Sequence, residues 1–315
     1  MPVLEAVEKT KSLVAIQNVL FATDFSEASE AALPYAAAFS ESFGSQLHLT
    51  HVLPDVKFLR PGAPDPAVFG PIYEDAHSNV QDKMRRLSKR MKAVPHQVCV
   101  RHGEISRVVS DMVRELEIDL VIAGTHGRTG LGRLIMGSVA EEILRQAPCP
   151  VLTVGPNVIG ASVRNLGHFE RNSNPAAADI RDVLYATDFR QHSNSAAILA
   201  ASLADGFHAR FGMLHVVEDY GDRLSEDPGP VEGSLKKLRD LLPADLDLEN
   251  EPEFLAQFGV AAESILQTAA ERETDLIVLG ARPANGHLKA VTHLGTAVAH
   301  RIIVGANCPV LTVRS

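Results

Sequence analysis

The chain has 315 residues, of which 45% are apolar and 22% are charged, and its formal net charge at pH 7 is −9. This length fits about two domains of ordinary size. An acidic chain is a poor fit to proteins that coat DNA, RNA or anionic lipid, because neutralising phosphates needs a basic face. No run approaches the roughly 20 apolar residues of a membrane helix. The polar, mixed-charge N-terminus is a poor signal peptide, so we expect a cytoplasmic protein.

The first half of the chain predicts alternating strands and helices. A short strand at 16–22 ends before TDFS, and a helix at 26–44 and a second strand at 47–53 follow. The stretch 54–71 is too rich in proline for the interior of a strand or a helix, and a charged helix is expected at 74–92. The predicted order is completed by a strand at 96–101, a further helix, the strand DLVIAG at 119–124, a helix at 138–147 and the strand CPVLTV at 149–154.

The second half repeats the same pieces in the same order. The offset from Asp24 to Asp188 is slightly larger than the offset from Cys149 to Cys308, a drift that small insertions and deletions explain. The stretch between the halves is rich in Asn, Ser, Gly and Pro and has no clear period, which is typical of a linker. We therefore predict a first domain at 13–155, a linker at 156–179 and a second domain at 180–315.

The alternation of strands and helices predicts parallel pairing with right-handed crossovers. The strands LVIAG and LIVLG are apolar at almost every position, as expected when helices cover both faces of a sheet. Each half is therefore predicted to be an open, doubly wound α/β domain with a parallel sheet. In such sheets ligands lie at the carboxyl ends of the strands, where the strand order reverses.

A glycine-rich stretch follows the fourth strand of the first half. Gly124 ends the strand, Gly127 lies in the loop, and Gly137 and Ser138 begin the next helix. A strand, a glycine loop and a helix N-terminus together favour an anion site, because the first helical amides have no internal partner. Arg128 would add positive charge. The alternative is structural: glycines end strands in many proteins, and Ser138 would be an ordinary N-cap. The stretch is neither a Walker A loop nor a G-x-G-x-x-G fingerprint.

The pattern G-x2-G-x9-G-[ST], with the opening TDFS and the closing CPVLTV, resembles the universal stress protein family. The resemblance covers nearly all of both halves, so the chain resembles a tandem universal stress protein. It implies a five-stranded parallel sheet of Rossmann-like type in each half. Members of the family divide into those that bind ATP or a related adenine nucleotide and those that do not, and the glycine pattern marks the binders.

Carried over by position, the resemblance implies a nucleotide site in the first half, for ATP, AMP or ADP with Mg²⁺. The adenine and ribose would lie against Asp24 and Val52, and the glycine loop would follow the nucleotide to its phosphates. The full set of expected contacts is Ala22, Thr23, Asp24, Val52, Ala123, Gly124, Gly127, Arg128, Gly137, Ser138 and Val139. Asp24 has an alternative role, because a carboxylate just ahead of a helix caps it well.

The second half departs from this pattern. Pro283 stands at the place of Gly127, and proline can neither donate an N–H to phosphate nor adopt the positive φ that glycine allows. The spacer between Gly280 and Gly295 is also longer than the one between Gly124 and Gly137. We interpret the second site as lost or altered and the second domain as mainly structural.

Other constellations predict no dedicated chemistry. Among the 13 histidines, His48, His51 and His215 lie on predicted strands, where they pack or form hydrogen bonds, and no tight ligand spacing indicates zinc. Cys149 and Cys308 begin matching buried strands, so packing is the expected role. No nucleophile motif is present, so we expect no catalytic residues and at most slow ATP hydrolysis.

The resemblance also implies how the halves meet, since the family pairs its domains through the last strand. The two CPVLTV strands could pair with each other, forming an internal pseudo-dimer, and two chains could also associate. Two further readings stay open. One is an interaction or scaffold protein of the same fold that binds no nucleotide, and the other is an adenylating enzyme with a substrate pocket that the sequence does not reveal.

Overall fold

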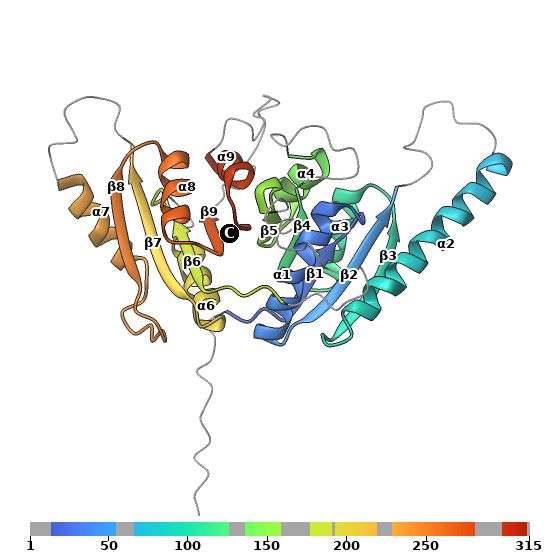
Figure 1. The fold of residues 1–315 in the computed structure, drawn as a ribbon, viewed down its shortest axis with the longest axis horizontal. Helices are drawn as coiled ribbons and strands as arrows, with labels where there is room; N and C mark the ends of the chain where they lie inside the picture. The colour runs from blue at the N-terminus through green and yellow to red at the C-terminus, as the bar shows by residue number, and fades with distance from the viewer. Residues whose placement is uncertain are drawn as a thin grey trace, which may run out of the picture.

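A computed structural model of the chain describes residues 14–54, 66–125, 136–158, 177–190, 193–218, 229–280 and 298–313. The two halves share one ten-stranded sheet with the order β3-β2-β1-β4-β5-β10-β9-β6-β7-β8 (Figure 1). No helix in these ranges is long and apolar enough to cross a membrane.

The elements of the first half follow the predicted order. They are β1 (Asn18–Ala22), α1 (Glu27–Phe43), β2 (Gln46–Leu53), α2 (Pro66–Arg90), β3 (His96–His102), α3 (Ile105–Glu115), β4 (Leu120–Gly124), α4 (Ser138–Gln146) and β5 (Val151–Val154). Ser26 caps α1 by accepting a hydrogen bond from the Ser29 N–H, and Gly44 ends it in the left-handed conformation with φ 67°. A hydroxyl residue at the N-cap and a glycine at the C-terminal end are common helix boundaries.

The second half repeats these elements. They are β6 (Asp182–Ala186), α6 (Ser193–Gly206), β7 (Arg210–Val217), α7 (Gly229–Asp240), β8 (Glu253–Phe258), α8 (Ala261–Glu271), β9 (Leu276–Gly280), α9 (Val298–Gly305) and β10 (Val310–Val313). Every strand pair within a half is parallel. The α/β class and the parallel sheets predicted from the alternation are therefore confirmed.

One prediction about α2 was wrong. The proline-rich stretch 54–71 was expected to exclude helix, yet α2 begins at Pro66 and contains Pro71. Proline is tolerated in the first turn of a helix, where the missing N–H would have had no partner, so Pro66 starts the helix without cost. Pro71 removes one backbone hydrogen bond from a helix of 25 residues, and the rest of the helix outweighs that loss.

The two halves join through their last strands, as the resemblance implied. β5 and β10 pair antiparallel, with Leu152 opposite Leu311 and Thr153 opposite Val310. The Thr153 hydroxyl also donates to the Val310 carbonyl at 3.1 Å, and the Thr312 hydroxyl donates to the Val151 carbonyl at 3.2 Å. Each half thereby covers a strand edge of the other, which removes two exposed edges.

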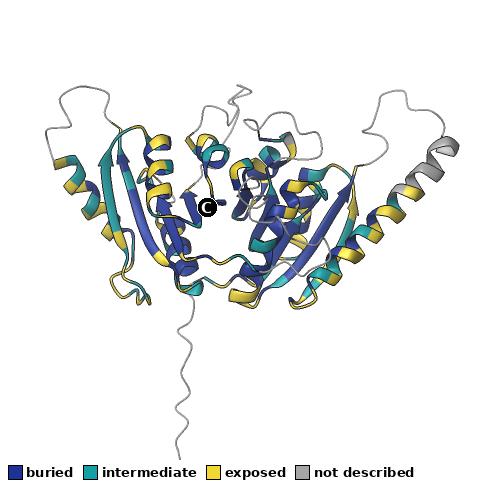
Figure 2. Cartoon of the chain, viewed as in Figure 1, coloured by how far each residue is buried: buried dark blue, intermediate teal, exposed yellow. Residues whose placement is uncertain are grey.

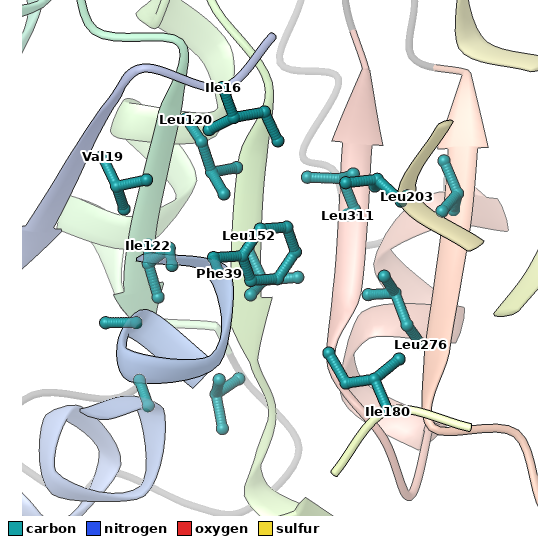
Figure 3. Close-up of a cluster of buried hydrophobic side chains, with 14 of the residues drawn as sticks. Ile16, Val19, Phe39, Leu120, Ile122, Leu152, Ile180, Leu203, Leu276 and Leu311 are labelled. Carbon is teal, nitrogen blue, oxygen red and sulfur yellow. The ribbon is translucent and has the colours of Figure 1, made fainter. Parts of the chain in front are cut away.

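Two apolar clusters lie on opposite faces of the sheet, and each extends through both halves. One packs α1, α2, α6 and α7 against the strands, and the other packs α3, α4, α8 and α9. Figure 2 shows the strands buried between exposed helix surfaces. Figure 3 shows the first cluster at the junction of the halves, with Leu152 on one side and Leu311 on the other. The junction is therefore continuous core, not a surface contact between separate bodies.

Candidate functional site

The strand order reverses between β1 and β4 in the first half. The chain leaves β1 toward β2 on one side, whereas β4 is followed by β5 on the other side. Ala22, the last residue of β1, lies opposite Ala123 near the end of β4. Crevices at such a reversal are where open α/β sheets bind their ligands. The carboxyl ends of these two adjacent strands thus bring together four of the predicted contacts, namely Ala22, Thr23, Ala123 and Gly124.

Hydrogen bonds hold the turn after β1 in place. The Thr23 N–H donates to the Thr50 carbonyl of β2 at 2.9 Å. The Thr23 hydroxyl accepts from the Phe25 N–H and donates to the Ser29 hydroxyl, each at 3.0 Å. The Asp24 carboxylate accepts from the Ser26 N–H at 2.9 Å. Asp24 therefore stabilises the turn, and the N-cap role proposed as its alternative belongs to Ser26.

A ring stack beside this turn was not predicted. Phe25 adopts a positive φ of 62°, and its ring stacks on His51 with centroids 4.8 Å apart. The Lys83 ammonium of α2 lies 5.3 Å from the Phe25 centroid, within cation–π range. His51 Nδ1 donates to the Thr23 carbonyl at 2.7 Å, which confirms the prediction that this histidine forms a hydrogen bond within the sheet. The sequence signal for Phe25 was TDF itself, which occurs in both halves.

The second half builds the same turn from equivalent residues. The Thr187 hydroxyl accepts from the Phe189 N–H at 3.1 Å, and the Asp188 carboxylate accepts from the Arg190 N–H at 3.1 Å. His215 Nδ1 donates to the Thr187 carbonyl at 2.8 Å, and burial is the main cause that lowers the pKa of His215. Phe189 has φ 57°, and Lys237 lies 5.6 Å from its ring centroid. The turn is therefore common to both halves.

The glycine loop is held together at its base. The Thr125 N–H and hydroxyl both donate to the Val154 carbonyl, at 3.0 and 3.1 Å, and the Gly137 N–H donates to the Thr125 carbonyl at 2.8 Å. The predicted contacts Gly127 and Arg128, and the whole of 126–135, lie outside the described residues, as does 281–297 with Pro283. The loss of the site in the second loop therefore stays a prediction.

The N-terminus of α4 lies next to the end of β4. Gly137 is its N-cap residue, with φ −64° and ψ 143°, and among the described residues no side chain caps the helix. Ser138 begins α4, and the following Val139 is 40% exposed. First-turn amides without a capping side chain, together with the helix dipole, favour an anion. Any residue can adopt the negative φ of Gly137, so the backbone conformation does not require glycine there.

Two predicted contacts have strong packing roles of their own. A Cβ added to Gly124 would lie 2.6 Å from the carbonyl carbon of Ala28, so glycine allows α1 to approach the end of β4. The side chain of Val52 is only 8% exposed, in β2 and beside Arg101 of β3. Little of the Val52 side chain is open to a ligand. Within the described part of the chain, no three His, Cys, Asp or Glu side chains gather closely enough to hold a metal ion.

Comparison with known proteins identifies the family. The model of the universal stress protein family matches residues 15–155 and 179–314. The chain belongs to this family. The universal stress protein MJ0577 of Methanocaldococcus jannaschii is 28% identical over 159 residues, which cover 45% of this chain and 96% of the relative. A relative from Coxiella burnetii is 28% identical over 138 residues, with 44% and 95% covered. Such relatives span one half of the present chain, which carries two copies of the family domain.

Two solved structures show the same fold over 95% of the chain. A universal stress protein from Archaeoglobus fulgidus aligns with a TM-score of 0.66 at 18% identity, covering 95% of this chain and 97% of that one. A protein of unknown function from Pseudomonas aeruginosa gives a TM-score of 0.56 at 16% identity, covering 95% and 93%. A universal stress protein crystallised in complex with cAMP aligns with 44% of this chain and 98% of its own, at 20% identity and a TM-score of 0.35.

Proposed function

We propose that this universal stress protein is a cytoplasmic stress-response protein that binds ATP, or a related adenine nucleotide, in its first half. The ligand is regulatory, is taken up with Mg²⁺, and occupies the crevice between the ends of β1 and β4. The second half is mainly structural. Any ATP hydrolysis is slow, because the first-half loop has no Walker lysine.

This proposal rests on two features that lie at the carboxyl ends of the adjacent strands β1 and β4. The turn Thr23–Phe25 follows the end of β1, and the N-terminus of α4 is tied to the end of the neighbouring β4 through Thr125 and Gly137. The first feature offers a carboxylate near a bound ribose, and the second offers amides to phosphates. The sequence pattern that marks nucleotide binders in the family supports the same site.

The first experiment identifies the ligand directly. The purified protein is denatured, any released nucleotide is identified by mass spectrometry, and the emptied protein is titrated with ATP by calorimetry. We expect roughly micromolar affinity, near −8 kcal/mol, with one site per chain. Absence of both released nucleotide and binding heat would refute the proposal and favour the scaffold alternative. Two equivalent sites per chain would contradict the assignment of the second half as structural.

A matched pair of variants locates the site. Asp24→Asn and Asp188→Asn each remove one charge while keeping a side-chain oxygen for the turn, where each carboxylate accepts from the backbone N–H two residues on. Asp188 also pairs with the Arg190 guanidinium at 3.1 Å. If the nucleotide lies in the first half, Asp24→Asn weakens ATP binding by about tenfold, as expected for a lost hydrogen bond to a charged group, and Asp188→Asn leaves it unchanged. Equal effects of the two variants would show that the charge acts on the turn rather than on the ligand.

A further inference from the structure

A pocket lies at the amino ends of the first-half strands, at the junction of the halves. Its volume is about 330 Å³, and its walls come from both halves. The first half contributes the segments before β1, β4 and β5 and the ring of Phe39, and the second half contributes α6 and β10. Figure 3 shows Ile16, Phe39 and Leu120 on one side of this junction and Leu203 and Leu311 on the other. Sites of this size at domain junctions, lined mainly by apolar side chains, are typical of small-molecule binding.

The two halves are related by pseudo-symmetry, so the residues at the matching place beside Tyr35 indicate what kind of group fits the pocket. From Asp24 to Leu53 and from Asp188 to Val217 the halves align without a gap, so Leu199 of α6 corresponds to Tyr35 of α1. Burial raises the pKa of Tyr35 to about 12, and Cys308 and Asp275 near its phenol add to the rise. The residues that correspond to these two are Cys149 and Asp119, and both line the pocket. At the mirror position a phenol ring therefore occupies the place that the shorter Leu199 leaves open.

The polar side chains Asp119 and Cys149 in the pocket wall do not favour an anionic ligand. One oxygen of the Asp119 carboxylate accepts from the backbone N–H groups of Gln17 and Asn18, at 2.7 and 2.9 Å. Burial raises the pKa of the Cys149 thiol to about 12, so it is neutral at physiological pH and is no thiolate nucleophile. An anion would lie beside the Asp119 carboxylate and would find no Lys or Arg among the described residues of the pocket wall, which is costly, so an uncharged ligand is favoured over an anion.

We propose that this pocket binds a small neutral aromatic molecule, a phenol in its simplest form, in the place that Tyr35 fills on the other side of the junction. The ring packs against Leu199, and the buried side chains of Phe39 and Leu203, which are equivalent by the pseudo-symmetry, lie behind it. Apolar cavities in proteins take up single aromatic rings. The site is distinct from the proposed nucleotide crevice, because it lies at the amino ends of the first-half strands.

The test uses p-cresol, which is the side chain of tyrosine, with benzoate as a charged probe of similar shape. The full chain is titrated with each compound, and the methyl resonances of leucine and valine are followed by NMR. We expect saturable shifts with p-cresol at Leu199, Leu203 and Val313, and at least tenfold weaker binding of benzoate. Failure of p-cresol to shift these methyls, or equal binding of benzoate, would overturn the proposal.

Leu199→Tyr supplies the matched variant, because it gives α6 the residue that α1 already has. It should fill the pocket and weaken p-cresol binding at least tenfold. Tyr35→Leu should create a second binding site beside Cys308. Unchanged p-cresol affinity in a folded Leu199→Tyr protein would overturn the assignment of the pocket. If that variant does not fold, Leu203→Phe, which copies Phe39, makes the same test, and the wild-type titration stands independently of both.

Discussion

Two glycines at matching positions predict opposite responses to the same substitution. Gly124 ends β4 and Gly280 ends β9. A Cβ at Gly124 would lie 2.6 Å from the carbonyl carbon, 2.7 Å from the Cβ and 2.8 Å from the carbonyl oxygen of Ala28 in α1. Among the described residues, a Cβ at Gly280 would meet only the Cβ of Ala196 at 4.0 Å, an ordinary contact. Gly124→Ala therefore forces α1 away from the sheet, and Gly280→Ala does not.

The magnitude follows from which atoms must move. Overpacking a core costs about 1–3 kcal/mol. Because the clash at Gly124 is with the backbone of a 17-residue helix, which cannot rotate away as a side chain can, we expect a loss near the upper end, about 3 kcal/mol. For Gly280→Ala we expect a change within about 0.5 kcal/mol, and alanine gains a little from a less flexible unfolded chain.

Equilibrium unfolding in urea, followed by circular dichroism, measures both free energies, and calorimetry with ATP measures the effect on the crevice. Displacing α1 also displaces the Thr23–Ser29 turn, so Gly124→Ala should weaken ATP binding as well as stability. Equal unfolding midpoints for the two variants would refute the packing argument. A destabilised Gly124→Ala protein with wild-type affinity would show that the position of α1 does not matter to the ligand.

Two further predictions concern buried polar groups. The Asp182 side chain is 0% exposed and accepts a hydrogen bond from Arg272, its main partner, at 2.9 Å. Arg272→Met should therefore lower the free energy of unfolding in urea by about 3 kcal/mol, because it leaves a buried charge without this partner. Adding Asp182→Asn to this variant should restore most of the loss. A loss that the second substitution does not reduce would contradict this account. In a thiol assay with DTNB at pH 8, Cys99 should react slowly, whereas Cys149 and Cys308, whose thiol pKa burial raises to about 12, should react only after unfolding. Three reactive thiols in the native protein would contradict that.

The repeat made the fold predictable. Each half supplied an independent copy of the same pattern, and the resemblance to the family implied the pairing of β5 with β10 that the structure contains. Strand limits agree closely, for example at β3, which was predicted at 96–101 and lies at His96–His102. Local pattern failed at the start of α2, because a count of prolines says nothing about where in a helix each proline falls.

Side-chain partners that are distant in sequence could not be predicted. His48 of β2 lies near Asn18, with His48 Nε2 3.4 Å from the Asn18 amide oxygen. In the second half the equivalent pair is Gly212 and Asp182, and a Cβ at Gly212 would lie 2.8 Å from the guanidinium carbon of Arg272. The histidine is thus replaced by an arginine that comes from the C-terminal end of α8. The sequence shows only that the second half has glycine where the first half has His48, whereas the structure shows that the Arg272 side chain takes the place of the histidine.

The candidate site was predictable in outline. The switch point, the turn at Thr23 and the α4 N-terminus lie where the pattern of strands and glycines predicted them. Phe25 and Lys83 were missed, since no motif links a ring to a lysine one helix later. The sequence also offered no sign that Gly124 is needed for the approach of α1.

The turns after β1 and β6 are similar, so the turn after β1 does not by itself indicate a nucleotide site. In both halves the His ring donates to the Thr carbonyl and contacts the Phe ring, and the Thr hydroxyl and the Asp carboxylate accept from the backbone N–H two residues on. This includes the half whose glycine loop carries Pro283. A constellation kept where the loop is altered has a structural reason to exist, namely that it joins β1 or β6 to the following helix. The nucleotide proposal therefore depends on the α4 N-terminus and its loop. Gly127→Pro, which copies the second half, should abolish ATP binding without loss of stability, and unchanged affinity would show that the glycine pattern has no part in binding.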